Sequence, residues 1–82
     1  MVSTEADHRR LRWHCRRGMK ELDIVLGWYL DACYPTAPAS EQAAFEALLE
    51  QEDPIIWRWL LGAAPLPEGI LGDVVRRLID RR

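Results

Sequence analysis

His14 and Cys15 are the neighbouring residues with the clearest potential for covalent chemistry, because a histidine base activates the thiol of cysteine hydrolases. Neighbouring positions of a helix, however, point about 100° apart, so the two side chains would not readily meet. We therefore expect Cys15 to be a small core residue and His14 a surface group. No catalytic residue is predicted.

Metal binding is not indicated either. Four acidic side chains lie close together along the chain: Glu46, Glu50, Glu52 and Asp53. They lack the Asp-x-Asp-x-Asp-Gly spacing of a calcium loop and have no histidine partners, so we expect a solvated helix face. Cys15 and Cys33 lack the spacing of zinc ligands or of a redox couple. Reduced thiols are expected, with a single disulfide as the alternative.

Nucleotides and nucleic acids are not favoured as ligands. The chain has no Gly-x-Gly-x-x-Gly or Walker sequence, so we predict no cofactor of its own. Residues 1–20 hold six basic and two acidic side chains, whereas residues 21–82 hold five basic and eleven acidic ones, for a net charge of −2. This overall charge and the apolar sequence after Gly18 argue against nucleic-acid binding. The uneven charge suits electrostatic steering toward a complementary protein surface.

The length of 82 residues predicts one domain, 1–82, with residues 1–5 flexible. A composition that is 49% hydrophobic and 29% charged is typical of an ordered globule. No apolar run approaches the roughly 20 residues of a membrane helix, and the N-terminus has neither the apolar stretch of a secretory signal nor the basic character of a transit peptide. We therefore expect a cytoplasmic protein without membrane insertion.

Hydrophobic periodicity predicts an all-α fold, a compact bundle of five short helices. The helices are expected over residues 6–17, from about 19 along a stripe that ends at 33, and over 41–51, 54–61 and 68–80. Gly18 fits the left-handed position that closes a helix, and Gly62 closes another. Ser40 is expected to cap the third helix, and Asp53 the fourth, with Pro54 at its first position.

One face of each helix is expected to form the core. On the second helix an apolar stripe recurs at helical spacing through Leu22, Val25, Leu26, Tyr29, Leu30 and Cys33. Ile24 and Trp28 lie off this stripe, so burial on more than one side is expected. The inward residues of the third and last helices are Ala44, Phe45, Leu48, Leu49, Ile70, Leu71, Val74, Val75, Leu78 and Ile79. Core positions are also predicted for Trp28 and Trp59, whereas the roles of Trp13 and Trp57 are left open.

A charged turn between the first two helices is the candidate recognition surface, and it consists of Arg16, Arg17, Gly18, Met19, Lys20 and Glu21. One interpretation is structural, with Gly18 as a cap and Arg17 paired weakly with Glu21 on the surface. The other is an interface, because a glycine lets another chain approach the backbone closely while flanking charges set register and on-rate. The residues by themselves leave both interpretations open.

This turn resembles the Arg-Gly-x-x-Glu signature of the SdhE family, which reads Arg17-Gly18-Met19-Lys20-Glu21 here. A second segment, Leu-Leu-Glu-Gln-Glu-Asp-Pro at residues 48–54, followed by Trp-Leu at 59–60, is similar to a second motif of that family. The resemblance covers about residues 11–79, in the same order and at the family's length. Ile55 departs from it, since family members commonly have an acid just after the Asp-Pro pair, and this puts any contact made by that acid in doubt.

The resemblance implies a five-helix, non-catalytic assembly factor that binds the flavoprotein subunit of succinate dehydrogenase, and often that of fumarate reductase. It would promote the covalent link between FAD and a histidine of that partner, so the partner carries the FAD. By carry-over, Arg17, Gly18 and Glu21 belong to the docking surface, and we expect a monomer. The alternative function is a regulatory interaction module of antitoxin type.

Overall fold

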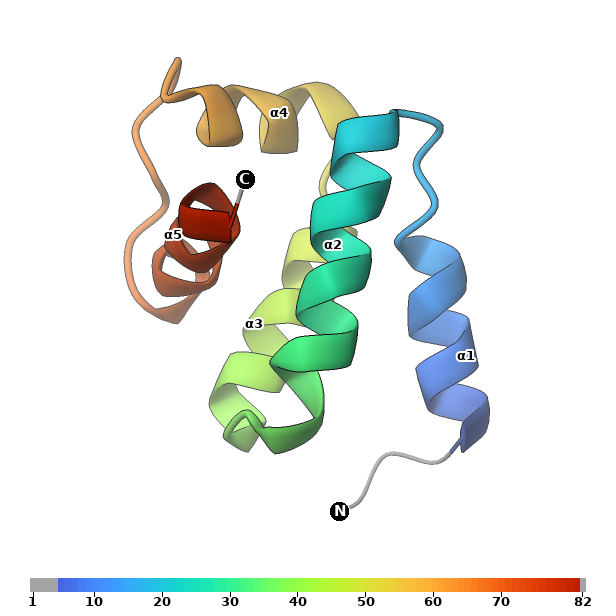
Figure 1. Cartoon of the computed structure of the whole chain (residues 1–82). Helices are drawn as coiled ribbons and strands as arrows, with labels where there is room; N and C mark the ends of the chain where they lie inside the picture. The colour runs from blue at the N-terminus through green and yellow to red at the C-terminus, as the bar shows by residue number, and fades with distance from the viewer. Residues whose placement is uncertain (1–4, 82) are drawn as a thin grey trace.

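The structure is a computed structural model that describes residues 5–81, with side chains from His8 to Arg81 (Figure 1). Its elements are α1 (Glu5–His14), α2 (Lys20–Ala32), the 3-10 helix η1 (Tyr34–Thr36), α3 (Ala39–Leu49), α4 (Asp53–Leu61) and α5 (Ile70–Arg81). No strand occurs in this range, and the predicted all-α class is confirmed. The flexibility predicted for residues 1–5 concerns residues 1–4, which lie outside the described range, and Glu5, where α1 begins.

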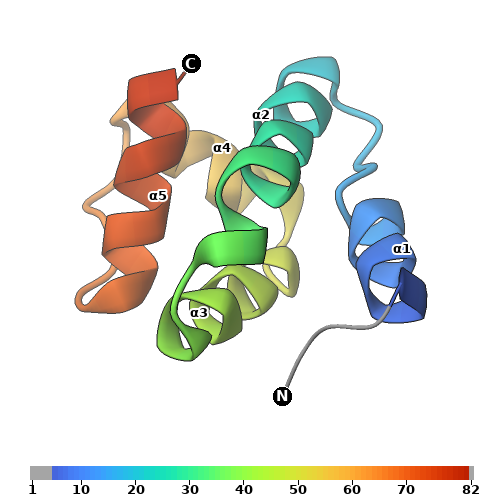
Figure 2. The ribbon, with the colours of Figure 1, turned by 60° about the horizontal axis from the view of Figure 1, so that its bottom comes forward.

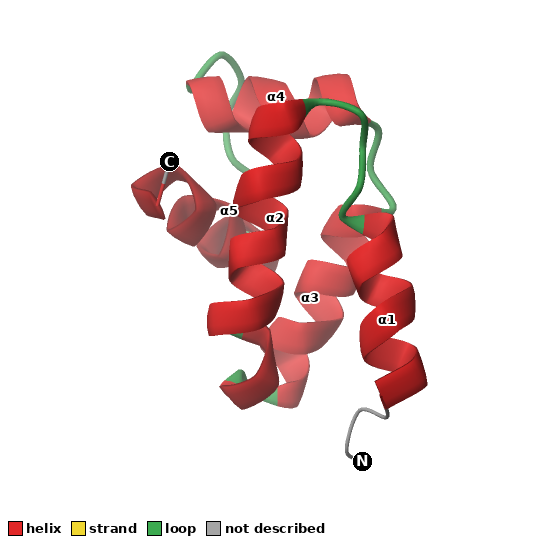
Figure 3. Cartoon of the chain, turned by 45° about the vertical axis from the view of Figure 1, so that its right-hand side comes forward, coloured by secondary structure: helices red, strands yellow, loops and turns green. Residues whose placement is uncertain are grey.

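The central helix is α2. It is flanked by α1 on one side and α5 on the other, α5 packs against α3, and α4 crosses one end of the bundle (Figures 1 and 2). Ion pairs tie neighbouring helices together at the surface, Arg12 of α1 with Asp31 of α2, and Arg77 of α5 with Glu41 of α3 at 3.7 Å. The α1–α2 loop and the α3–α4 turn lie side by side at the end where α4 begins (Figure 3).

The core is built from apolar side chains of all five α-helices. The stripe predicted on α2 is buried at Leu22, Val25, Leu26, Tyr29 and Leu30, whereas Cys33 is partly buried. The other fully buried side chains that were predicted are Phe45, Leu48, Leu49, Val74, Val75 and Leu78. Helical periodicity therefore identified the inward faces of α2, α3 and α5 correctly.

Phe45 lies at the centre of an aromatic cluster. Its ring stacks on Tyr29 with 4.5 Å between the ring centroids and tilts against Tyr34 at 5.8 Å. The tyrosine hydroxyls leave the core at its edge, where Tyr29 donates to Glu41 and Tyr34 donates to Glu46 over 2.6 Å. Burial, together with the Glu41 carboxylate, raises the pKa of Tyr29 above its ordinary value, which keeps this phenol a donor. Glu46 is exposed, as expected, and also accepts a hydrogen bond from a core tyrosine.

Some apolar residues lie further out than predicted. Ile24 is 59% exposed and Ile70 is 42% exposed, although both were expected inside. Ile24 lies off the buried stripe of α2, and Ile70 is the first residue of its helix. Trp28 and Trp59 are partly buried against the core rather than enclosed by it, and so is Trp57.

The first helix ends at His14 instead of Arg17, so Gly18 is not its closing residue. Gly18 does take the left-handed conformation, with φ +82°, but in the middle of the loop. The helix stops early because the backbone N–H of Arg17 donates to the side chain of Asp23 at 2.6 Å instead of to a carbonyl of the preceding turn. A tertiary hydrogen bond therefore overrides a local helix propensity.

The helix starts differ by one or two residues from the predicted positions. Ser40 is not a cap, because α3 already begins at Ala39 and the carbonyl of Pro38 accepts its first hydrogen bond, from Gln42 at 2.9 Å. Asp53 is the first residue of α4 rather than its cap. The last helix begins at Ile70 rather than at residue 68, since Gly69 has a left-handed φ of +76°. The end of α4 at Gly62, with φ +73°, is confirmed.

Replacement of Phe45 by alanine is expected to lower the free energy of unfolding by about 3–5 kcal/mol, because it leaves a cavity between two packed tyrosine rings. Urea denaturation followed by far-UV circular dichroism measures the change. The exposed Ile24→Ala serves as the control and should stay within about 0.5 kcal/mol of the wild type. Equal losses at the two positions would contradict the described core.

Candidate functional site

Residues 16–21, called the docking turn from here on, occupy the loop between α1 and α2 and the first turn of α2. Four of them face solvent: Arg16, Gly18, Lys20 and Glu21. The other two, Arg17 and Met19, are partly buried, and Met19 packs against the core. The predicted set therefore divides into an outward group and an inward pair.

The Arg17 side chain ties the docking turn to the turn between α3 and α4. Its Nε donates to Asp53 Oδ1 at 2.8 Å, in an ion pair at the start of α4. One terminal nitrogen donates to the carbonyl oxygens of His14 at 2.9 Å and Leu49 at 2.8 Å. The other terminal nitrogen donates to the carbonyl of Gln51. The Arg17 side chain is 13% exposed, so its charge is used mainly inside the protein.

Three helix ends meet at this guanidinium. His14 is the last residue of α1 and Leu49 the last of α3, and Asp53 is the first residue of α4. The last carbonyls of a helix have no hydrogen-bond partner within it and carry partial negative charge. A cation placed there donates hydrogen bonds to them and offsets that charge. An acid in the first turn of the next helix is favoured for the opposite reason. Arg17 and Asp53 thus complement the helix ends as well as each other.

Two residues outside the predicted set accept hydrogen bonds from the docking turn. Asp23, in the first turn of α2, accepts a hydrogen bond from the backbone of Arg17. Asp53 accepts from the side chain of Arg17. Asp23 lies two positions after Glu21, and Asp53 belongs to the second family-like segment. Arg17 thus makes a partly buried contact that joins two segments distant in the sequence.

Gly18 is the most open point of the docking turn. A Cβ placed on it would meet no atom within 4 Å, and its φ of +82° lies in the left-handed region that favours glycine. Since no side chain covers it, the backbone here is open to approach by another molecule. Rigid anchoring by Arg17 therefore coexists with an accessible bend one residue later.

Trp13 lies on the surface beside the docking turn, which answers the question that its sequence position left open. It belongs to the last turn of α1, and its side chain is 68% exposed. The guanidinium carbon of Arg16 lies 5.8 Å from the centroid of its ring, within the range of a cation–π contact. Arg16 thus connects an exposed aromatic surface with the charged turn.

Cys15 is a core residue, as predicted, and His14 is partly buried rather than on the surface. Burial raises the pKa of the Cys15 thiol to about 11. A thiol with such a pKa is protonated near neutral pH and is a poor nucleophile. Both cysteines are free, as expected.

Two further findings concern the described residues as a whole. No three of their histidine, cysteine, aspartate and glutamate side chains come together as a group that could hold a metal ion. None of the helices in this range is both long enough and apolar enough to cross a membrane. Of the four acids expected on a solvated face, Glu46, Glu50 and Glu52 are exposed, whereas Asp53 is partly buried. Glu46 and Asp53 also accept hydrogen bonds, from Tyr34 and Arg17.

Comparisons with known proteins agree on one family. The family model Sdh5, described as the flavinator of succinate dehydrogenase, matches residues 9–82. The FAD assembly factor SdhE of Pseudomonas aeruginosa is 38% identical over 80 residues, which cover 98% of this chain and 95% of the relative. The protein of the same name from Methylococcus capsulatus is 45% identical over 69 residues, or 84% of this chain and 83% of the relative. No solved structure gives a significant match.

The adjacent residues Arg16 and Arg17 should differ sharply in their effect on stability. Arg17→Ala is expected to lower the free energy of unfolding by about 2–4 kcal/mol, because it leaves carbonyl groups and the Asp53 carboxylate without their donor. Arg16→Ala removes an exposed side chain and should change it by less than about 0.5 kcal/mol. Urea titration of both variants measures the difference, and similar values would refute the anchoring role of Arg17.

Alkylation should distinguish the two thiols. At about pH 8, iodoacetamide is expected to modify Cys33 well before Cys15, because Cys15 is 3% exposed and burial raises its pKa to about 11. Mass spectrometry of peptides after timed quenching gives the two rates. Repeating the reaction in denaturant provides the control, since both sites should then react at similar rates. Equal rates in the native protein would contradict the buried position of Cys15.

Proposed function

The chain belongs to the Sdh5 family of flavinators of succinate dehydrogenase, and we propose that it binds the flavoprotein subunit of that enzyme and promotes covalent attachment of FAD to it. The observation that carries this proposal is the division of the docking turn. Arg17 holds the turn from inside, while Arg16, Gly18, Lys20 and Glu21 remain at the surface. Such an arrangement suits a binding surface more than a reaction centre.

A loop fixed before binding has an energetic advantage. The hydrogen bonds of Arg17 to His14, Leu49 and Gln51 hold the loop in one conformation, so less conformational entropy is lost when a partner docks. The opposite charges of Lys20 and Glu21 would set the orientation of the partner, and Gly18 would allow close contact with the backbone. These features support docking of a folded protein onto a preformed surface.

The proposed mechanism is selection of one conformation of the flavoprotein. Docking that is tighter when the partner's own histidine and the isoalloxazine ring are aligned raises the population of that aligned state. This chain then needs no reactive group, in keeping with a buried, protonated Cys15. FAD is the substrate that the partner carries, and we propose that this chain holds no cofactor itself.

We propose the flavoprotein of fumarate reductase as a second partner, because it would present the same kind of flavin to be attached. Action as a monomer at one docking surface, and a cytoplasmic location, remain predictions.

Gly18→Val should sharply reduce flavinylation of the partner. The left-handed backbone makes valine unfavourable there by about 1–2 kcal/mol, and its side chain also obstructs the docking turn. Gly62→Val is the matched control, because Gly62 has a similar φ of +73° and equally open surroundings but lies at the far end of α4. In-gel flavin fluorescence of the co-expressed succinate dehydrogenase flavoprotein measures covalent FAD, and urea denaturation checks that both variants lose similar stability.

Several-fold less covalent flavin with Gly18→Val than with Gly62→Val is the expected result. Equal flavinylation with the two variants would remove the docking turn from the mechanism. Co-purification with the wild-type chain supplies a second test. Recovery of a different protein, in place of a flavoprotein, would favour the regulatory module of antitoxin type.

A further inference from the structure

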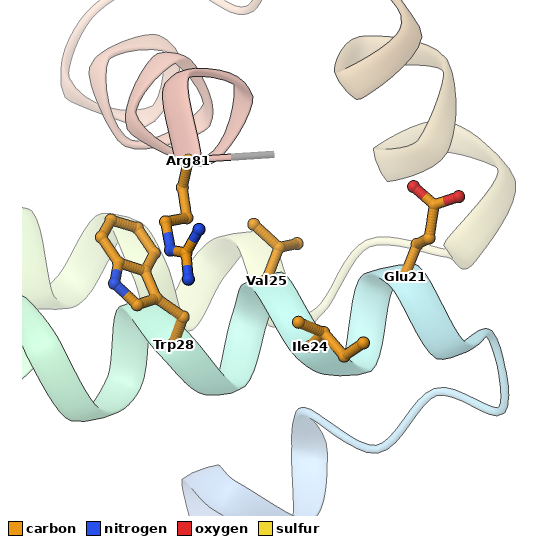
Figure 4. Close-up of a pocket in the computed structure, with 5 residues that line it drawn as sticks. All are labelled: Glu21, Ile24, Val25, Trp28 and Arg81. Carbon is orange, nitrogen blue, oxygen red and sulfur yellow. The ribbon is translucent and has the colours of Figure 1, made fainter.

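A groove beside the docking turn runs along α2 toward the end of α5. It is lined by Glu21, Ile24, Val25, Trp28 and Arg81 (Figure 4). The middle of the groove is apolar, and Ile24 is exposed there to 59% of its full surface. Glu21 lies at one end of this stretch of α2 and Trp28, with Arg81 above it, at the other.

The lining of α2 follows helical spacing. Glu21, Ile24 and Trp28 are three and four positions apart, so they form one stripe along the helix surface. Glu21 and Trp28 are seven positions apart, or about 10 Å along the axis. Ile24 gains little from burial there, since more than half of its surface stays in contact with water.

Arg81 completes the groove from another helix. Its guanidinium carbon lies 5.6 Å from the centroid of the Trp28 ring, so the cation is held over the aromatic face. Stacking uses the flat side of a guanidinium, whereas its N–H donors lie in the plane and point outward from its edge. An arginine held over a ring at this distance is therefore well suited to receive a carboxylate through its N–H donors.

We infer that this groove receives a short amphipathic segment of the flavoprotein partner. An apolar side chain of the segment packs between Ile24 and Trp28, an acidic one pairs with Arg81, and a basic one lies toward Glu21. The charge pattern of the groove favours this chemistry, because opposite charges lie at the two ends of an apolar centre. The inference rests on the proposed function, and Glu21 joins the groove to the docking turn as one continuous surface.

A second copy of this chain is a weaker candidate for the occupant. Stable interfaces between proteins use roughly 20–30 residues on each side, whereas five residues line the groove. As an extension of the docking turn, however, the same five residues enlarge a surface that already carries charged and glycine positions. The size of the groove therefore fits a subsidiary contact better than an independent dimer interface.

Two pairs of variants test the groove, each with its control on the same protein. Ile24→Glu is compared with Ile70→Glu, since both replace an exposed isoleucine by an acid. Arg81→Glu is compared with Arg76→Glu, since both reverse an exposed charge on α5 and change the net charge equally. Affinity of the full chain for the purified succinate dehydrogenase flavoprotein is measured by biolayer interferometry, and circular dichroism checks the fold.

Each groove variant is expected to weaken binding by about tenfold or more, because it buries an unpaired acid or places like charges together. The two control variants should remain within about twofold of the wild type, as rim substitutions away from a contact do. If the groove variants bind like their controls while Gly18→Val binds poorly, the groove is not a contact and the proposed function still stands. If the wild type itself does not bind the flavoprotein, both proposals fail.

Sedimentation velocity of the chain alone tests whether a second copy of the chain occupies the groove. A monomeric wild type supports the inference. A dimer that Ile24→Glu converts to a monomer, while Ile70→Glu leaves it intact, would assign the groove to self-association and overturn the inference.

Discussion

The carbonyl groups that end α1 and α3, and the carboxylate that begins α4, all reach the guanidinium of Arg17. Each of these groups would be costly to enclose without a partner, and they come from two segments far apart in the sequence. One partly buried cation satisfies them together and fixes the angle at which the chain enters α2. The positions of the α1–α2 loop and of the α3–α4 turn are therefore not independent. Both follow from where this side chain lies.

In this arrangement, neighbouring residues of one short motif have different roles, one inside the protein and the others at its surface. Arg17 is occupied internally, whereas Gly18, Lys20 and Glu21 are exposed within the next few positions. The two segments by which the chain resembles its family also touch, because Arg17 bonds to the turn that precedes Asp53. What looks in the sequence like two separate signatures is one structural unit. A substitution in the second segment would thus change the conformation of the docking turn, although the residues of the turn stay the same.

Sequence reasoning succeeded where the determining forces are local or periodic. The inward stripe of α2 follows from helical spacing, and the end of α4 follows from the left-handed glycine at Gly62. It failed at the end of α1, where the backbone N–H of Arg17 donates to the Asp23 side chain six positions later and its guanidinium finds acceptors 32 and 36 positions away. The exposure of Ile24 was missed for a related reason. Periodicity indicates the face on which a side chain lies, but not whether another helix covers that face.

The final turn of α5 lies beyond Leu78, the last fully buried residue of the chain's described part, and it carries Arg81 onto the ring of Trp28. A substitution of the exposed Arg81 costs the interior little, yet it alters the chemistry of the groove next to the docking turn. In the groove that we propose as a contact, a substitution at this end of α5 would therefore change partner selectivity without loss of the fold.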